Sequence, residues 1–368
     1  MRFNRFWPYR RMLLSGRFVG ALWRSRRNIV ATNRGRPPAS GPYMAELDVT
    51  YRCNCQCQMC QRWQDLRKEE LTLEEYERLA RVFRHLGVHQ ISIAGGEPLL
   101  REDIFAILTS FARGMSVNLC TNGILLESNA DQLVRTRISC VTVSLDGATS
   151  RPHDSVRGAP GSFQQVERGI YALVASSRRT RPLVRVRMTV SDRNIDEVRR
   201  YYEKWKEAVD DVLLQPAHFC RDAFYTGLSE GSFGIDPHRL ARQLDGTPFR
   251  RDGYMRGLLR SLQRNGGFPH HRCYAGVLMV RFDPWGNVFP CLEQHTRVGS
   301  IREHDFETIW NSDAFHKVRR EIGSTRNCTC WYNNTALISH YANALFRTTG
   351  RGLHAGYGNL TGEIPKAV

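Results

Sequence analysis

The chain has 368 residues, of which 41% are hydrophobic and 30 are Gly. This length predicts about two to three domains, and the apolar content suffices for a buried core. No apolar stretch approaches the roughly 20 residues that span a bilayer, so the composition excludes a polytopic membrane protein. The 11 Cys are an odd number, which argues against a fully paired secreted protein and favours metal ligation in a reducing compartment.

The net charge of +17 is concentrated near the N-terminus, where residues 1–45 hold ten Arg and no acidic residue. Residues 1–44 are predicted to form a basic amphipathic helix up to about Trp23 and a linker at Gly35–Pro42. This arm favours contact with an anionic membrane surface or an acidic partner. The alternative is an arm packed on its own domain with solvated arginines. No clean apolar segment follows Arg10–Arg11, so we expect no signal peptide and a cytoplasmic location, peripheral at the inner membrane surface.

Residues 45–222 are predicted to alternate between strands and helices. A capping box starts a helix at Thr72 with Glu75, and a second is expected at Ser162 with Gln165. Strands are expected at Ala45–Thr50, Gln90–Ala94, Ser116–Cys120, Cys140–Ser144, Val184–Val190 and Val212–Gln215. Six strand–helix repeats imply an α/β fold with a parallel sheet, helices outside it and chemistry at the carboxyl ends of its strands.

Residues 223–368 are richer in loops and are predicted to be a second domain. Cys273 and Cys291 flank a predicted hairpin with its turn at Pro284–Asn287, and Cys328 and Cys330 follow. Four thiolates could hold an iron–sulfur cluster or a structural zinc ion.

A cysteine triplet follows the first predicted strand directly. Cys53, Cys57 and Cys60 have the spacing C-x3-C-x2-C, with Cys55 between them. Three thiolates this close can hold three irons of a [4Fe–4S] cube and leave the fourth iron open to a small molecule. Cys55 is interpreted as a bystander, since the triplet is complete without it.

With this triplet the chain resembles the radical SAM superfamily, and three further motifs at predicted strand ends carry the same resemblance. They are Gly95-Gly96-Glu97-Pro98, Thr121-Asn122-Gly123 and Ser144-Leu145-Asp146-Gly147. The resemblance covers roughly Glu46 to Gln215 and implies a partial (β/α)6 TIM-like barrel.

The resemblance also implies a chemistry. The open iron would bind S-adenosylmethionine (SAM), and reductive cleavage would give a 5′-deoxyadenosyl radical that abstracts a substrate hydrogen. An electron donor such as flavodoxin or ferredoxin is then expected. The residues expected to contact SAM or the substrate are Gly95, Gly96, Glu97, Pro98, Asn122, Ser144, Asp146 and Arg157. Glu97 is expected to accept the ammonium, and Arg157 to pair with the carboxylate.

The C-terminal cysteines resemble the SPASM extension in its shortened form, called twitch. This resemblance implies one auxiliary [4Fe–4S] cluster held by Cys273, Cys291, Cys328 and Cys330. A cluster with four thiolates would serve as an electron relay, whereas one with three could ligate the substrate. Cys120, Cys140 and Cys220 are interpreted as buried small side chains, and His218 as a loop histidine.

The substrate is the least defined part of this prediction. The main hypothesis is an oxidoreductase that modifies a peptide or protein, although only about 45 residues precede the first strand, too few for a winged-helix leader-recognition module. A dehydrogenase, epimerase or decarboxylase of a small metabolite or lipid intermediate is the first alternative. The second is a non-enzymatic iron–sulfur or zinc protein that binds nucleic acid through its basic surface. The complete motif set argues against specific nucleic-acid binding.

Overall fold

The computed structural model describes residues 16–65, 67, 69–176, 181–217, 234–263, 272–292, 296–324 and 330–346. Residues 1–15, His218, Cys220 and Cys328, for which the sequence made predictions, lie outside this set. No helix in the described part of the chain is long and apolar enough to cross a membrane.

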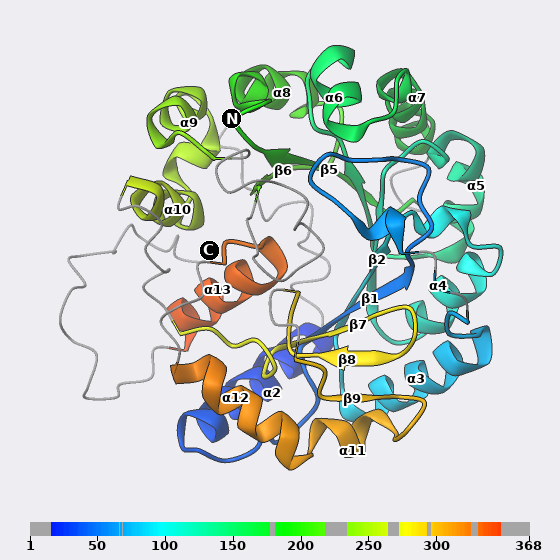
Figure 1. The fold of residues 1–368 in the computed structure, drawn as a ribbon, viewed down its shortest axis with the longest axis vertical. Coiled ribbons are helices and arrows are strands. Elements are labelled where there is room, and N and C mark those ends of the chain that lie inside the picture. The colour runs from blue at the N-terminus through cyan, green and yellow to red at the C-terminus, as the bar shows by residue number, and fades with distance from the viewer. Residues whose placement is uncertain are drawn as a thin grey trace.

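Six parallel strands pair in chain order, as the alternating pattern predicted. They are β1 (Met44–Thr50), β2 (Gln90–Gly95), β3 (Ser116–Thr121), β4 (Cys140–Ser144), β5 (Leu183–Val190) and β6 (Asp211–Pro216). The helices between them are α3 (Leu73–Leu86), α4 (Ile104–Ala112), α5 (Leu126–Thr136), α6 (Ser150–Arg157), α7 (Ser162–Ala175) and α8 (Val198–Trp205). Figure 1 shows these helices on the outside of the curved sheet, as in a partial barrel.

The remaining helices follow the barrel or precede it. They are α2 (Gly16–Asn33), α9 (Pro237–Leu244), α10 (Gly253–Gln263), α11 (Phe306–Trp310), α12 (Asp313–Ser324) and α13 (Ile338–Leu345). Single turns lie at Arg62–Gln64, Pro98–Leu100, Ile195–Glu197, Pro248–Arg251 and, as a π-helical turn, Asn333–Leu337. Helix α2 was expected to end near Trp23 but continues to Asn33, because Ser25, Asn28 and Ile29 on its second half are buried.

The C-terminal hairpin extends the barrel sheet. Strand β7 (Met279–Phe282) pairs parallel with β1, and β8 (Asn287–Phe289) and β9 (Gly299–Ser300) follow antiparallel. The sheet order is therefore β6-β5-β4-β3-β2-β1-β7-β8-β9. The loops that hold Cys53, Cys57 and Cys60 and those that hold Cys273 and Cys291 thus adjoin strands of one continuous sheet. The domain limits at 45 and 223 stay a prediction.

One of the two predicted capping boxes is present. Thr72 and Glu75 cap α3 reciprocally, and Gly87 ends that helix in the left-handed conformation. The box predicted at Ser162 is wrong, because Ser162 is already helical and its hydroxyl donates to Asp154. The Asp154 carboxylate, on α6, also accepts from the Gly161 and Phe163 amides and so caps α7 from outside the helix.

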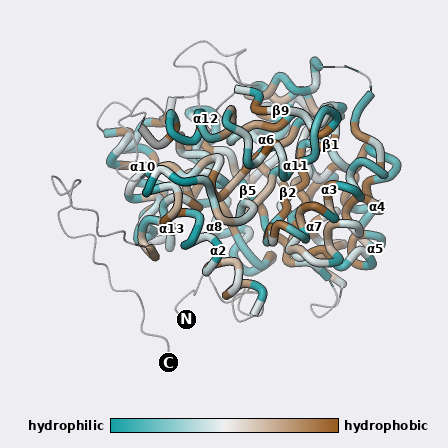
Figure 2. Tube along the Cα trace, turned by 90° about the horizontal axis from the view of Figure 1, so that it is seen from below, coloured by the Kyte–Doolittle hydropathy of each residue, from teal (hydrophilic) through white to brown (hydrophobic). Residues whose placement is uncertain are grey.

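One continuous apolar core lies between the strands and the helices. Strand β5 shows how it forms: its even residues are buried, whereas its odd residues, Arg185, Arg187 and Thr189, are only half-buried and face the barrel interior. Figure 2 shows hydrophobic residues along the strands and inward helix faces, with hydrophilic residues outside. The barrel interior is consequently polar and open to chemistry.

Candidate active site

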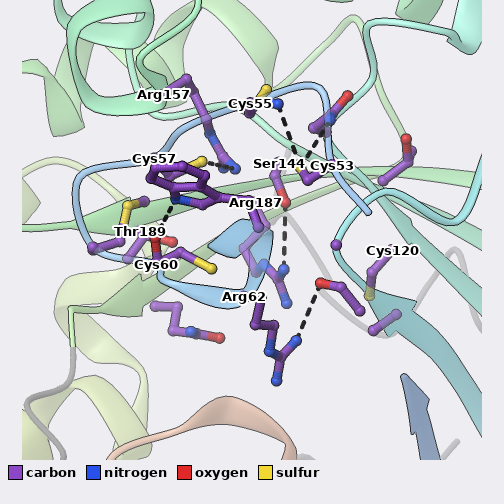
Figure 3. A pocket seen from close by; sticks show the side chains of 18 of the residues that line it. Cys53, Cys55, Cys57, Cys60, Arg62, Cys120, Ser144, Arg157, Arg187 and Thr189 are labelled. Atoms are coloured by element: carbon purple, nitrogen blue, oxygen red, sulfur yellow. Dashed lines mark hydrogen bonds between the residues drawn. The ribbon is translucent and has the colours of Figure 1, made fainter. Parts of the chain in front are cut away.

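A pocket lies at the carboxyl ends of the strands, where the parallel sheet predicted it (Figure 3). Every strand from β1 to β6, or the loop that follows it, contributes to its lining. The predicted site residues among the lining are Cys53, Cys57, Cys60, Gly95, Gly96, Asn122, Ser144 and Arg157. Glu97, Pro98 and Asp146 are not among the lining residues and lie behind it.

The cysteine loop turns its thiols into this pocket. Backbone and side-chain N–H groups point at two of them: Cys55 N lies 3.4 Å from Cys53 Sγ, and Arg157 Nη1 lies 3.7 Å from Cys57 Sγ. A hydrogen bond from Cys55 and the Arg157 guanidinium lower the pKa of Cys57 to about 6, although its burial acts in the opposite direction. These two groups therefore favour the thiolate form of Cys57, the form that binds iron, whereas burial raises the pKa of Cys60 to about 11.

Gly95 and Gly96 are required by the neighbouring backbone. Gly95 has φ of +128°, and a Cβ on it would lie 2.2 Å from the Thr50 carbonyl oxygen. A Cβ on Gly96 would lie 2.3 Å from the Arg52 carbonyl oxygen. The end of β2 thus packs directly against the strand that leads into the cysteine loop, and this contact fixes the pocket wall.

Glu97 holds the turn after β2. Its fully buried carboxylate accepts hydrogen bonds from Asn122 N at 2.7 Å, Thr121 Oγ1 at 2.8 Å and Leu99 N at 3.0 Å. Burial raises the pKa of Glu97 to about 7 despite these donors. In the described chain this carboxylate joins the β2 and β3 loops, and the predicted contact with the SAM ammonium stays a prediction.

Asp146 and Arg157 form a buried pair beside the pocket. Arg157 Nε lies 2.8 Å from Asp146 Oδ2, and Thr189 N donates to Asp146 Oδ1 at 2.7 Å. Asp146 therefore orients Arg157, which reaches the pocket. Ser144 accepts from Arg187 Nη2 at 3.4 Å, so the predicted contacts of these residues with SAM or substrate stay predictions.

Sequence reasoning missed several polar lining residues. They are Glu46, Arg62, Cys120, Arg187, Gln215 and Tyr332. Strand alternation could have found Glu46 and Arg187, since each stands on the polar, inward face of a strand whose other face is apolar. Cys120, interpreted as a buried small side chain, is half-buried and lines the pocket, whereas Cys140 is buried as predicted.

The described C-terminal cysteines gather behind the hairpin. Cys273 packs against the group of buried residues that contains Cys291, and Cys330 packs with Leu292, the next residue along. Ala275 N lies 3.5 Å from Cys273 Sγ, and Tyr332 N lies 3.3 Å from Cys330 Sγ. None of the described cysteines forms a disulfide bond.

Two family models match the chain. The model of the radical SAM superfamily matches residues 47–205, and that of SPASM, an iron–sulfur cluster-binding domain, matches residues 273–331. The chain thus carries a radical SAM domain followed by a SPASM domain. The resemblance drawn from the four motifs is thereby confirmed, and the SPASM match covers all four C-terminal cysteines.

Among curated relatives, the chain is similar to the AdoMet-dependent heme synthase of Methanosarcina barkeri. The two are 28% identical over 76% of this chain and 85% of the relative. Mycofactocin maturase MftC of Mycobacterium tuberculosis is 24% identical over 78% of this chain and 75% of the relative. A probable GTP 3′,8-cyclase of Archaeoglobus fulgidus is 32% identical, but over only 46% of this chain and 57% of the relative.

Solved structures share the fold. Streptococcus suis SuiB bound to precursor peptide SuiA has a TM-score of 0.63 at 16% identity, covering 85% of this chain and 74% of that chain. The enzyme anSMEcpe with bound AdoMet and Cp18Cys peptide has a TM-score of 0.59 at 18% identity, covering 78% and 85%. The predicted fold class is thus confirmed.

The two domains imply a SAM-binding [4Fe–4S] cluster and auxiliary cluster binding. In the described chain no three Cys, His, Asp or Glu side chains converge as around a single metal ion. A cube takes one thiolate on each iron, so its ligands stand farther apart than those of one ion. Three pocket thiols, two of which accept from N–H donors, fit such a cube, and the SPASM match favours iron–sulfur over the zinc alternative.

Proposed function

We propose that this radical SAM enzyme is an oxidoreductase that modifies a peptide or protein substrate. The meeting of the two domains carries the proposal, because Tyr332, directly after the SPASM match, lines the same pocket as the cysteine loop. Two proteins of the same fold are described with bound peptides, SuiB and anSMEcpe, which supports a peptide over a free metabolite. Family membership favours an enzyme over the nucleic-acid-binding alternative.

In this proposal each part of the pocket has a role. Cys53, Cys57 and Cys60 would hold the SAM-binding cluster, and Cys273, Cys291, Cys328 and Cys330 one auxiliary cluster. Reduced by flavodoxin or ferredoxin, the first cluster supplies one-electron cleavage of SAM and thereby hydrogen abstraction. Asn122, Ser144 and Arg157 line the pocket where they can orient SAM, while Glu97 and Asp146 hold the lining in place. The thiols require a reducing compartment, which supports a cytoplasmic location.

A reconstituted assay tests the proposal. The full chain, reconstituted anaerobically with iron and sulfide and reduced with dithionite, is given SAM and a peptide library. We expect 5′-deoxyadenosine to rise with peptide, and the modified peptide to lose two hydrogens by mass spectrometry. Cleavage of SAM that no peptide stimulates would contradict a peptide substrate.

A small polar metabolite or lipid intermediate is the second candidate substrate. The similarity to the heme synthase favours a metabolite, because that relative is named for a small molecule and the match spans 85% of it, more than for the other two curated relatives described above. The same assay with a peptide-free extract of small metabolites separates the two candidates. Stimulation by this extract alone would favour the metabolite.

Replacing Cys291 with Ala is expected to uncouple the reaction. Cys291 is buried beside Cys273 and distant in the chain from the triplet, so the first cluster should still form. We expect 5′-deoxyadenosine within about twofold of wild type, product near background and a loss of about four irons per chain. Iron counting and product mass measure these effects. Full product turnover in this variant would remove the auxiliary cysteines from the reaction.

We also propose that helix α2 contacts an anionic membrane surface. Its outer face exposes Trp23 and Val19, at 57% and 60%, and exposed arginines flank them. Arg27 lies over the Trp23 ring, 4.6 Å from its centre. Val19 and Trp23 lie one helical turn apart and form an apolar strip between guanidinium groups. This arrangement matches a lipid interface, where negative headgroups lie above an apolar layer.

Vesicle binding tests this contact. Replacing Arg17, Arg26 and Arg27 with Gln should weaken binding to phosphatidylserine-containing vesicles about a hundredfold, because each basic residue contributes about 1 kcal/mol at an anionic surface. Sedimentation measures the bound fraction, with phosphatidylcholine vesicles as the control. Equal binding of variant and wild type would favour the alternative, an arm that packs only on its own chain.

A further inference from the structure

Strand β1 presents three polar side chains to the barrel interior. Glu46, Asp48 and Thr50 alternate with apolar residues that belong to the main core, and each is 1% exposed or less. Polar side chains this deeply buried need partners. The partners differ between the two carboxylates.

The two carboxylates of β1 are neutralised unequally. Asp48 forms ion pairs with Arg62 at 3.1 Å and with Arg281 at 2.5 Å. Glu46 forms no ion pair within the described residues. The donors to its oxygens in the described part of the chain are neutral: Tyr332 Oη at 3.2 and 3.3 Å, and Asn334 Nδ2 at 2.7 Å.

Glu46 also lines the pocket, which Asp48 does not. The segment after Cys330 holds its carboxylate in place through Tyr332 and Asn334, so the group is built into the wall. Burial and the nearby Asp48 raise the pKa of Glu46, although Asn334, Arg62 and Arg281 act in the opposite direction. A cation entering the pocket would supply the missing partner and form a charge-assisted hydrogen bond.

We propose that Glu46 binds a cationic nitrogen of the substrate, an ammonium or a guanidinium. The assignment rests on the proposed function in one respect: in a peptide, this cation is an amino terminus, a lysine or an arginine. Among the residues that the structure describes, neither Arg62 nor Arg157 pairs with Glu46 directly. Asp146 pairs with Arg157, and Asp48 pairs with both Arg62 and Arg281. An anionic substrate group, bound by Arg187 instead, is the competing outcome.

Saturation-transfer difference NMR with simple probes tests the assignment. The full-length reconstituted protein is titrated with n-butylammonium, butyrate and n-butanol, three probes of one chain length that differ in charge. We expect butylammonium to bind most tightly. Its Kd should rise about tenfold in Glu46→Gln, which corresponds to about 1.4 kcal/mol. The Kd of Glu46→Asp, which keeps the charge, should lie between those of wild type and Glu46→Gln.

Glu127→Gln is the matched control, since it removes the same charge from a side chain that pairs with Arg168 at the surface, outside the pocket. Its affinity for butylammonium should equal that of wild type. Equal affinity of Glu46→Gln and wild type, preference for butyrate, or no binding of any probe would each overturn the assignment. The probes need no turnover, so failure here is distinguishable from failure of the peptide assay.

Discussion

Replacing Cys53 with Ala is expected to abolish SAM cleavage and to remove about four irons per chain of the about eight that two cubes hold. Cys53 lines the pocket, and its sulfur accepts a hydrogen bond from the Cys55 amide. Without this thiolate only Cys57 and Cys60 of the triplet remain. Two thiolates leave half of the irons of a cube without a protein ligand, so the cluster should be lost and 5′-deoxyadenosine should fall to background.

Cys140→Ala is the control for this experiment. Its thiol is buried in β4, and it does not line the pocket, so iron content and SAM cleavage should match wild type. Cys55→Ala asks a second question, because Cys55 lies in the same loop and lines the pocket. If it keeps iron and cleavage, Cys55 is a bystander. Normal iron and cleavage in Cys53→Ala would show that Cys55 can replace it.

The barrel was predictable from sequence because its signals are local. Alternating residues mark β5, the reciprocal pair Thr72 and Glu75 marks the start of α3, and the Gly-Gly step marks the end of β2. The second capping box failed for a non-local reason. Asp154 lies eight residues before Ser162 and accepts the hydrogen bond of its hydroxyl. Residue spacing within one helix does not reveal this contact.

The pocket was only partly predictable for the same reason. Its cysteines and glycines stand in short motifs, but Glu46 and Tyr332 are 286 residues apart and meet only in the fold. Glu97 and Asp146 have motif positions that suggest direct SAM contact. The structure shows their oxygens occupied by the protein's own donors, which the sequence could not indicate.

The hairpin and the cysteine loop share one buried charged group. Asp48 on β1 accepts from Arg62, which follows the triplet, and from Arg281 on β7. Arg62 Nη1 also donates to the Gly95 carbonyl oxygen at 3.2 Å, and Arg281 Nη2 donates to Tyr51 Oη at 2.6 Å. A single carboxylate therefore connects the cysteine loop, the end of β2 and the hairpin of the SPASM match.

Replacing Asp48 with Ala should consequently lower the free energy of unfolding by about 3–5 kcal/mol, because it leaves buried guanidinium groups without a counter-charge. Arg281 is 1% exposed and Arg62 6%, so water cannot replace the carboxylate. Arg281→Met should lower the free energy of unfolding by less, since Asp48 then still forms its ion pair with Arg62. Urea denaturation under anaerobic conditions measures both. Asp196→Ala, which breaks the surface pair with Arg239, is the control and should cost less than about 1 kcal/mol. If Asp48→Ala were no more destabilising than this control, the buried group would not join the hairpin to the barrel.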